Sequence, residues 1–328
     1  MLLALATLPV LAQTVPDLDP IEALDPSPSQ LTLKLGGQAD SAQGGKYQAK
    51  VIWNATPDLT LFLSGDRSNL ESTSQAPSPS GTSTVTTTTG LGGAYLFGLF
   101  DLGLQYDHSD MSDLLTSQRY YLQPALDGGT WRFGLEFSTR KTVFDRLKFT
   151  GRTINTPSGP VTVSGYADLH LSDTGQGANF EFGGDVWRLF GSYTHYSYGA
   201  FEGTTDVTRI RDASGQVSSE IFKALYDRVV KRFEDLSASR LSGKAALLDS
   251  TATLGLEANL DRTRWILEVN QDVDHLSGEI SNTCTGTAGW KATPTFTLEL
   301  QLGATRSEAF GTDRFAGLAL TFRTKPSF

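Results

Sequence analysis

Residues 131–140, WRFGLEFSTR, alternate between apolar and polar side chains with a period of two. In an extended strand this pattern puts the aromatic and aliphatic residues on one face and the arginines, glutamate and serine on the other. A soluble sandwich would need a continuous apolar face inside and a solvated face outside. Here the polar face carries both signs of charge, so we expect water on the inside and lipid on the outside.

The same alternation recurs along the chain, for example in residues 99–107 and 296–304. An even number of strands returns both ends of a barrel to one side of the membrane, as in bacterial outer-membrane barrels. The sequence therefore predicts an all-β, transmembrane, antiparallel up-and-down barrel of about fourteen strands. The expected strands are residues 31–38, 46–54, 58–66, 84–96, 99–109, 117–126, 130–140, 174–183, 186–198, 251–260, 263–273, 279–290, 295–305 and 314–323.

The connections between these strands alternate in length. Short turns are expected at residues 55–57, 97–98, 127–129, 184–185, 261–262 and 291–294. The longest connections are residues 141–173 and 199–250, and such asymmetry is typical of short periplasmic turns and long extracellular loops. Residues 161–171 also alternate, which indicates a strand extension above the membrane. Apolar residues recur at helical spacing over residues 221–236, which predicts a helix. This helix would pack on the rim, fold into the lumen or bind a partner.

Each of the five tryptophans lies beside a short turn and on the apolar side of its strand. Indole rings favour the boundary between water and lipid, so the tryptophans predict an interfacial girdle at the short-turn side. Its members are Trp53, Trp131, Trp187, Trp265 and Trp290. A second belt, toward the opposite strand ends, is expected from Tyr47, Tyr106, Tyr120 and Tyr193.

Composition and the N-terminal sequence bound the remaining possibilities. The 328 residues are 39% hydrophobic and 19% charged, and no run approaches the roughly 18 apolar residues of a spanning helix. Residues 1–12 are expected to be a signal peptide, residues 13–30 an acidic, proline-rich periplasmic tail, and residues 31–328 the barrel. A net charge of −9 argues against nucleic-acid binding, and the sequence has no basic cluster typical of an anionic-lipid patch. The single cysteine, Cys284, leaves stability to the closed barrel.

The C-terminal residues 317–322, GLALTF, resemble the assembly signal of bacterial outer-membrane β-barrels. The chain also ends on an aromatic residue, Phe328, as that superfamily does. Phe315 stands where the signal usually has a polar residue, and six residues follow Phe322. The resemblance implies a porin-like protein of the outer membrane, inserted by the barrel-assembly machinery and enclosing a polar lumen.

Charged residues on the inward face are balanced, eight of each sign, which favours a hydrated pore or a salt-bridged interior. The expected pore-lining residues are Lys34, Lys50, Asp101, Asp107, Arg119, Arg132, Glu136, Arg140, Glu181, Arg188, Glu257, Arg264, Glu268, Asp272, Glu299 and Arg323. The favoured function is passive or weakly selective diffusion of small polar solutes. Its expected partners are outer-membrane lipid and those solutes; no cofactor is expected, and the oligomeric state is left open.

One motif points to an alternative, enzymatic function. His195 and Ser197 resemble the His-x-Ser element of outer-membrane phospholipases and lipid A deacylases, in which histidine activates serine. Tyr198 departs from the asparagine that follows the serine there. Glu202 or Asp206 would have to orient the imidazole. A third possibility is a non-conducting surface or structural barrel.

Two further kinds of site have weaker support in the sequence, an omptin-type protease site and a calcium site. The pairs Asp107-His108 and Asp274-His275 suit an omptin-type protease poorly, because adjacent residues of a strand point to opposite faces. Asp272, Asp274 and Glu279 have oxygen ligands suited to calcium, although a solvated acidic loop explains them equally. The sequence has no phosphate loop, dinucleotide fingerprint or zinc spacing, so no metal site is expected.

Overall fold

A computed structural model describes the chain in nine ranges. They are residues 30–41, 44–70, 84–111, 115–156, 159–199, 202–211, 247–275, 278–308 and 311–324. The expected signal peptide, nearly all of the N-terminal tail, the helical pattern of residues 221–236 and Phe328 lie outside these ranges. No helix in the described ranges is long and apolar enough to cross a membrane.

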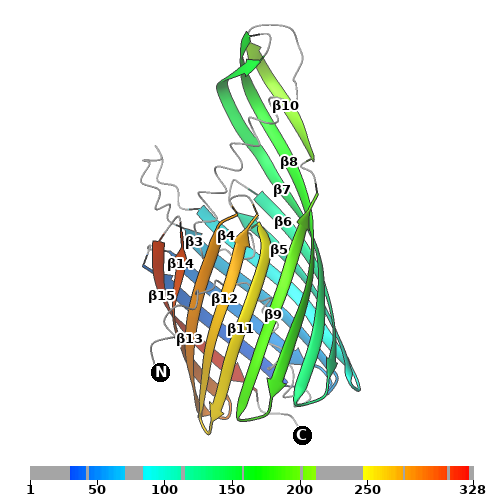
Figure 1. The fold of residues 1–328 in the computed structure, drawn as a ribbon, viewed down its shortest axis with the longest axis vertical. Helices are drawn as coiled ribbons and strands as arrows, with labels where there is room; N and C mark the ends of the chain where they lie inside the picture. The colour runs from blue at the N-terminus through cyan, green and yellow to red at the C-terminus, as the bar shows by residue number, and fades with distance from the viewer. Residues whose placement is uncertain are drawn as a thin grey trace, which may run out of the picture.

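The described residues form one antiparallel sheet of fifteen strands (Figure 1). The strands are β1 (Gln30–Asp40), β2 (Gly45–Asn54), β3 (Leu59–Leu70), β4 (Thr84–Phe97), β5 (Phe100–Met111), β6 (Leu115–Asp127), β7 (Trp131–Thr156), β8 (Gly159–Gly183), β9 (Trp187–Tyr198), β10 (Glu202–Arg211), β11 (Leu248–Leu260), β12 (Thr263–Asp274), β13 (Ile280–Thr293), β14 (Phe296–Ser307) and β15 (Gly311–Arg323).

Fourteen of these strands close into a barrel. β1 pairs with β15, and β9 pairs with both β8 and β11, so the ring has no open edge. Each remaining barrel strand pairs with its sequence neighbours. The predicted fourteen-stranded antiparallel barrel is confirmed. All the predicted strand positions fall within these fourteen strands, to within one or two residues at the ends.

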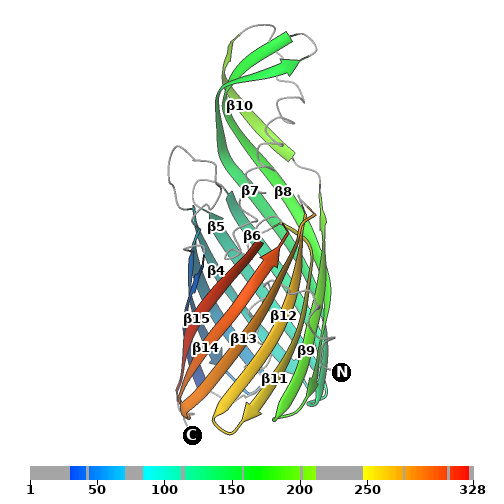
Figure 2. The same ribbon diagram turned by 60° about the vertical axis from the view of Figure 1, so that its left-hand side comes forward.

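The fifteenth strand belongs to an arm that rises from one end of the barrel (Figures 1 and 2). β7 and β8 are 26 and 25 residues long, about twice the length of most of their neighbours, and β10 pairs with the distal part of β8. The predicted loop at residues 141–173 is therefore wrong: β7 and β8 continue through it. The extension expected at residues 161–171 is present as part of β8. Two register shifts interrupt the distal pairing of β7 with β8.

The end from which the arm rises is called the arm end, and the opposite end the turn end. Short connections join the strands at the turn end, at residues 55–58, 98–99, 128–130, 184–186, 261–262 and 294–295. All five tryptophans lie near these turns, and each is exposed on the outer face, from Trp131 at 38% to Trp187 at 54%. The tyrosines of the second belt also face outward, with Tyr106 packed against Tyr120 at 5.0 Å between ring centroids.

Three phenylalanines on the inner face lie over glycines of the neighbouring strand. Phe190 is the cross-strand partner of Gly255, and Phe315 that of Gly303. A Cβ atom on either glycine would lie 2.1 Å from the facing ring. Phe62 and Gly92 repeat the arrangement between β3 and β4. The aromatic residue at position 315, unusual for an assembly signal, is thus packed on Gly303 within the barrel wall.

We expect Gly255→Ala to destabilise the barrel by about 1–3 kcal/mol, because its methyl group must displace the Phe190 ring. Urea unfolding in detergent micelles, followed by tryptophan fluorescence, measures this loss. Gly286→Ala is the matched control, since its Cβ would meet only the Leu302 carbonyl oxygen at 3.9 Å. Equal stability of the two variants contradicts the interpretation.

Candidate functional site

The barrel interior is built from the side chains that alternate with the exposed apolar face. Each of the sixteen charged residues predicted to line the pore occupies such a position, and each is buried or half-buried. Several contact one another, either across adjacent strands or across one intervening strand. Arg132 donates to Asp101 at 2.6 Å, and Arg188 forms an ion pair with Glu181 at 2.8 Å. The structure thus brings together charges that were predicted separately.

A second group of charges lies between β11, β12 and β14. The Arg264 guanidinium donates to both carboxylate oxygens of Glu257, at 3.0 and 3.2 Å. It also lies 3.6 Å from the Glu299 carboxylate. Asn259 donates to Glu257 at 2.8 Å, so this carboxylate, whose residue is 1% exposed, accepts several hydrogen bonds.

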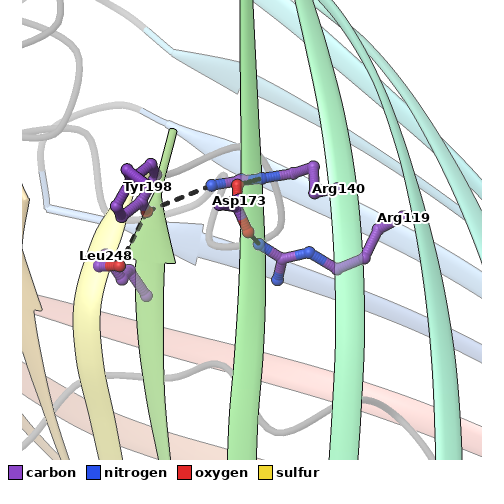
Figure 3. Close-up of polar contacts among 5 residues, drawn as sticks. All are labelled: Arg119, Arg140, Asp173, Tyr198 and Leu248. Atoms are coloured by element: carbon purple, nitrogen blue, oxygen red, sulfur yellow. Dashed lines mark hydrogen bonds and ion pairs between the residues drawn. The ribbon is translucent and has the colours of Figure 1, made fainter. Parts of the chain in front are cut away.

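The most deeply buried group surrounds Asp173 on β8 (Figure 3). Arg140 Nε donates to Asp173 Oδ2 at 2.5 Å, and Arg119 Nη2 donates to Asp173 Oδ1 at 3.3 Å. The Asp173 side chain is fully buried, and that of Arg140 is 1% exposed. One carboxylate therefore bridges two guanidinium groups from β6 and β7. Sequence reasoning missed Asp173 because it assigned residues 141–173 to a loop, although Arg140 is its cross-strand partner.

The bridge continues toward β9 and β11 (Figure 3). Arg140 Nη2 donates to the Tyr198 hydroxyl at 3.3 Å, and that hydroxyl donates to the Leu248 carbonyl at 2.7 Å. The Tyr198 ring is stacked on His275, with centroids 3.7 Å apart, and His275 Nδ1 lies 2.6 Å from Asp249 Oδ1. Polar contacts thus link the strands from β6 to β12 near the arm end.

Aromatic rings also contact Arg119. Its guanidinium carbon lies 5.8 Å from the Tyr121 ring centroid and 5.0 Å from that of Tyr196, distances typical of cation–π contacts. Both tyrosines are buried. Neither was predicted as a site residue. Their inward position is nevertheless readable from alternation, since Tyr121 lies two residues after Arg119 and Tyr196 one residue after the outward His195.

Two lysines lie opposite each other on the wall formed by β1 and β2. Lys34 and Lys50 are direct cross-strand partners, so two ammonium groups of the same sign lie on adjacent strands. The Lys50 ammonium lies 5.2 Å from the Phe62 ring centroid. Like charges in this relation repel each other.

Toward the arm end, the inner face of β5–β8 becomes apolar. Met111, Leu115, Phe144 and Leu171 occupy inward positions and are between 0 and 3% exposed. Sequence reasoning expected a polar inner face throughout and missed this cluster. Phe144 and Leu171 belong to the residues wrongly assigned to a loop, and Met111 and Leu115 lie beyond the ends of the predicted strands.

The predicted catalytic pair lies on the outer face. His195 and Ser197 are exposed on β9 and alternate with the buried Thr194 and Tyr196. In the described part of the chain, no hydrogen bond joins His195 to Ser197 or to a carboxylate.

The two carboxylates proposed to orient His195 are too distant. His195 is the partner of Gln176 on β8, whereas Glu202 pairs with His170 and Asp206 with Tyr166. At about 3.3 Å per residue along β8, the backbone of Glu202 lies roughly 20 Å from that of His195, and the backbone of Asp206 roughly 33 Å. The predicted orienting role of Glu202 or Asp206 is therefore wrong.

The omptin-type and calcium alternatives gain no support from the geometry. His108 on β5 faces outward, away from the lumen, whereas His275, after β12, is stacked on the Tyr198 ring. Asp272 and Asp274 are buried, and Glu279 lies in the connection before β13. Within the described ranges, no group of three or more acidic, histidine or cysteine side chains is arranged to hold a metal ion.

Comparison of the sequence with protein-family models and with curated proteins gives no match. Among solved structures, the chain is similar to the monoaromatic hydrocarbon channel CymD, with a TM-score of 0.51 and 10% identity over 93% of this chain and 91% of that one. The chain therefore has a porin-like β-barrel fold.

Two other solved barrels are also similar to this porin-like fold, with lower TM-scores. OpdK of Pseudomonas aeruginosa, solved with vanillate, has a TM-score of 0.38 and 9% identity over 90% of this chain and 97% of that one. The KdgM porin, in complex with disordered oligogalacturonate, has a TM-score of 0.40 and 9% identity over 90% and 99%.

We expect Asp173→Asn to destabilise the barrel by about 3 kcal/mol, because two guanidinium groups then lose their shared counter-charge. Asp101→Asn is the control, since its ion pair with Arg132 is partly exposed and contributes about 1 kcal/mol or less. Urea unfolding in detergent micelles compares them. A smaller loss for Asp173→Asn than for Asp101→Asn contradicts the bridging role.

Proposed function

We propose that this protein is an outer-membrane channel for passive or weakly selective diffusion of small polar solutes. The observation that carries the proposal is a closed barrel with exposed apolar side chains outside and ion-paired polar side chains inside. Barrels of about eight strands are filled by side chains, whereas those of 16–18 strands leave an aqueous channel. With fourteen strands, the side chains on the inner wall decide how wide the passage is.

Pairing of the lumenal charges supports weak selectivity. Arg132, Arg188 and Arg264 each lie within hydrogen-bonding distance of a carboxylate, so their fields largely cancel along those walls. We propose that the sixteen lumenal charges line the solute path.

The orientation follows from the tryptophans and the turns. We propose that the turn end faces the periplasm and the arm end the outside, as in outer-membrane barrels with short periplasmic turns. Residues 199–250, expected as one of the longest connections, lie largely outside the described ranges. The signal peptide and the periplasmic tail remain proposals, and the barrel-assembly machinery is the proposed route of insertion.

Planar-bilayer recording of the full chain tests the channel, and we expect discrete ohmic conductance steps. Replacing both Lys34 and Lys50 by Glu should raise the cation-to-anion permeability ratio by roughly threefold, because the two substitutions make this wall more negative by about four charges. Lys141→Glu, on the outer face, is the control and should leave the ratio unchanged. Absence of conductance rejects the channel, and an unchanged ratio in the double variant rejects the path beside these lysines.

The hydrolase alternative has a direct test. We expect neither the unaltered protein nor Ser197→Ala to release fatty acid from phospholipid or lipid A vesicles faster than the background rate. The physical reason is that neither a paired base nor an orienting carboxylate reaches Ser197 in the described residues. Activity above background that disappears in Ser197→Ala restores the hydrolase.

A surface-attachment role is the second candidate, and the arm of β7, β8 and β10 favours it. A three-stranded arm of this kind presents backbone edges beyond the barrel wall. Attachment and conduction are compatible, since the arm rises from one side of the rim and the ion-paired walls lie in the barrel below it (Figure 2).

A further inference from the structure

The outer face of the barrel carries charge at one end only. Among the strand residues whose side chains are described, the charged side chains at outward positions are four cations and one acid, Arg67, Lys141, Arg306, Arg314 and Asp110, and all lie toward the arm end. Three outward histidines, His108, His170 and His195, are found there as well. At the turn end the outward positions hold tryptophans and aliphatic residues, and the turns themselves include Asp58, Asp185 and Asp261 beside Arg262.

Outward exposure of these cations follows from alternation. Arg306 lies between the buried Thr305 and Ser307, and Lys141 lies between the buried Arg140 and Thr142. In the described residues, no carboxylate is within ion-pairing distance of Arg67, Lys141, Arg306 or Arg314. The lumenal arginines differ, since each described ion pair inside the barrel joins a guanidinium to a carboxylate.

The four outward cations and Asp110 form a charged band around the arm end. Arg306 and Arg314 are its most closely spaced cations. Arg306 on β14 faces Thr312 on β15, so Arg314 is its diagonal neighbour, at about 7–8 Å between backbones. Asn282 on β13 is the direct partner of Arg306 on the other side. Glu308, in the connection after β14, is the nearest acid along the chain and forms no ion pair with Arg306 among the described residues. Two adjacent guanidinium groups repel each other unless an anion lies between them.

We propose that Arg306 and Arg314 bind the phosphate groups of anionic lipid headgroups in the membrane leaflet at the arm end. Guanidinium groups bind phosphate bidentately, and the Asn282 amide supplies a further donor on the same face. The position is right for a headgroup, because the cations lie at strand ends while the adjoining outward face is apolar. The inference rests on the proposed membrane location of the barrel.

The lipid proposal explains why the band is absent from the turn end. An outer leaflet rich in phosphorylated lipid attracts cations, with about 1 kcal/mol for each Lys or Arg near such a surface. Free phosphate offers the same chemistry but would select no particular end of the barrel wall. A lipid headgroup is the occupant that also contacts the apolar surface beside the arginines.

The test uses the full chain in detergent and measures the affinity of fluorescent diphosphorylated lipid A. We expect Arg306→Gln/Arg314→Gln to weaken this affinity by roughly thirtyfold, corresponding to the loss of two surface cations. Arg262→Gln/Lys291→Gln removes two cations from the turn end and should change it by less than about twofold. Heat-dependent gel mobility checks that both variants form barrels.

Two competition arms identify the ligand. Dephosphorylated lipid A should bind roughly tenfold more weakly than the diphosphorylated form, and inorganic phosphate should compete only at far higher concentration. Unchanged affinity in Arg306→Gln/Arg314→Gln, an equal loss in the turn-end variant, or equal binding of dephosphorylated lipid overturns the proposal. Equal competition by inorganic phosphate also overturns it. Bilayer conductance of the same variant should be unaltered, so failure of lipid binding is distinguishable from failure of the channel.

Discussion

Closure of the backbone hydrogen-bond ladder is the constraint on which the rest of this structure depends. In hydrocarbon an unpaired N–H or C=O group costs several kcal/mol, so a membrane-spanning sheet must have no edge. Pairing of β1 with β15, and of β9 with both β8 and β11, meets this requirement. Once the ring is closed, the period of two assigns each side chain either to lipid or to the interior.

The interior then has to accommodate charge without water on every side. Asp173 shows how this is done: a fully buried carboxylate lies between Arg140 and Arg119, and the Tyr198 hydroxyl accepts a further Arg140 hydrogen. The four residues come from four successive strands of the barrel, β6 to β9, so the register of these strands brings them together. A shift of one residue would turn these side chains toward lipid, and the buried charges therefore oppose register slippage.

Alternation made the barrel predictable, and the same rule explains what was missed. The sixteen lumenal charges were placed on the inner face because parity along a strand is local information. Their partners depend on register between strands, which no single strand reveals. Asp173 was missed because a polar, alternating segment beyond the membrane has the composition of a loop, yet its backbone continues the ladder of β8. The error on Glu202 and Asp206 has the same origin, since β10 takes them up the arm and away from His195.

The charged band on the outer face shows a further limit of reading along the chain. Arg67, Lys141, Arg306 and Arg314 are far apart in sequence, and none belongs to a basic run. Closure of the barrel collects them at one end, whereas the tryptophans collect at the other. The two sets are chemically independent, because indole rings respond to any interface and guanidinium groups respond to anionic headgroups. Both distributions agree with the proposed orientation, in which the arm end faces the more anionic leaflet.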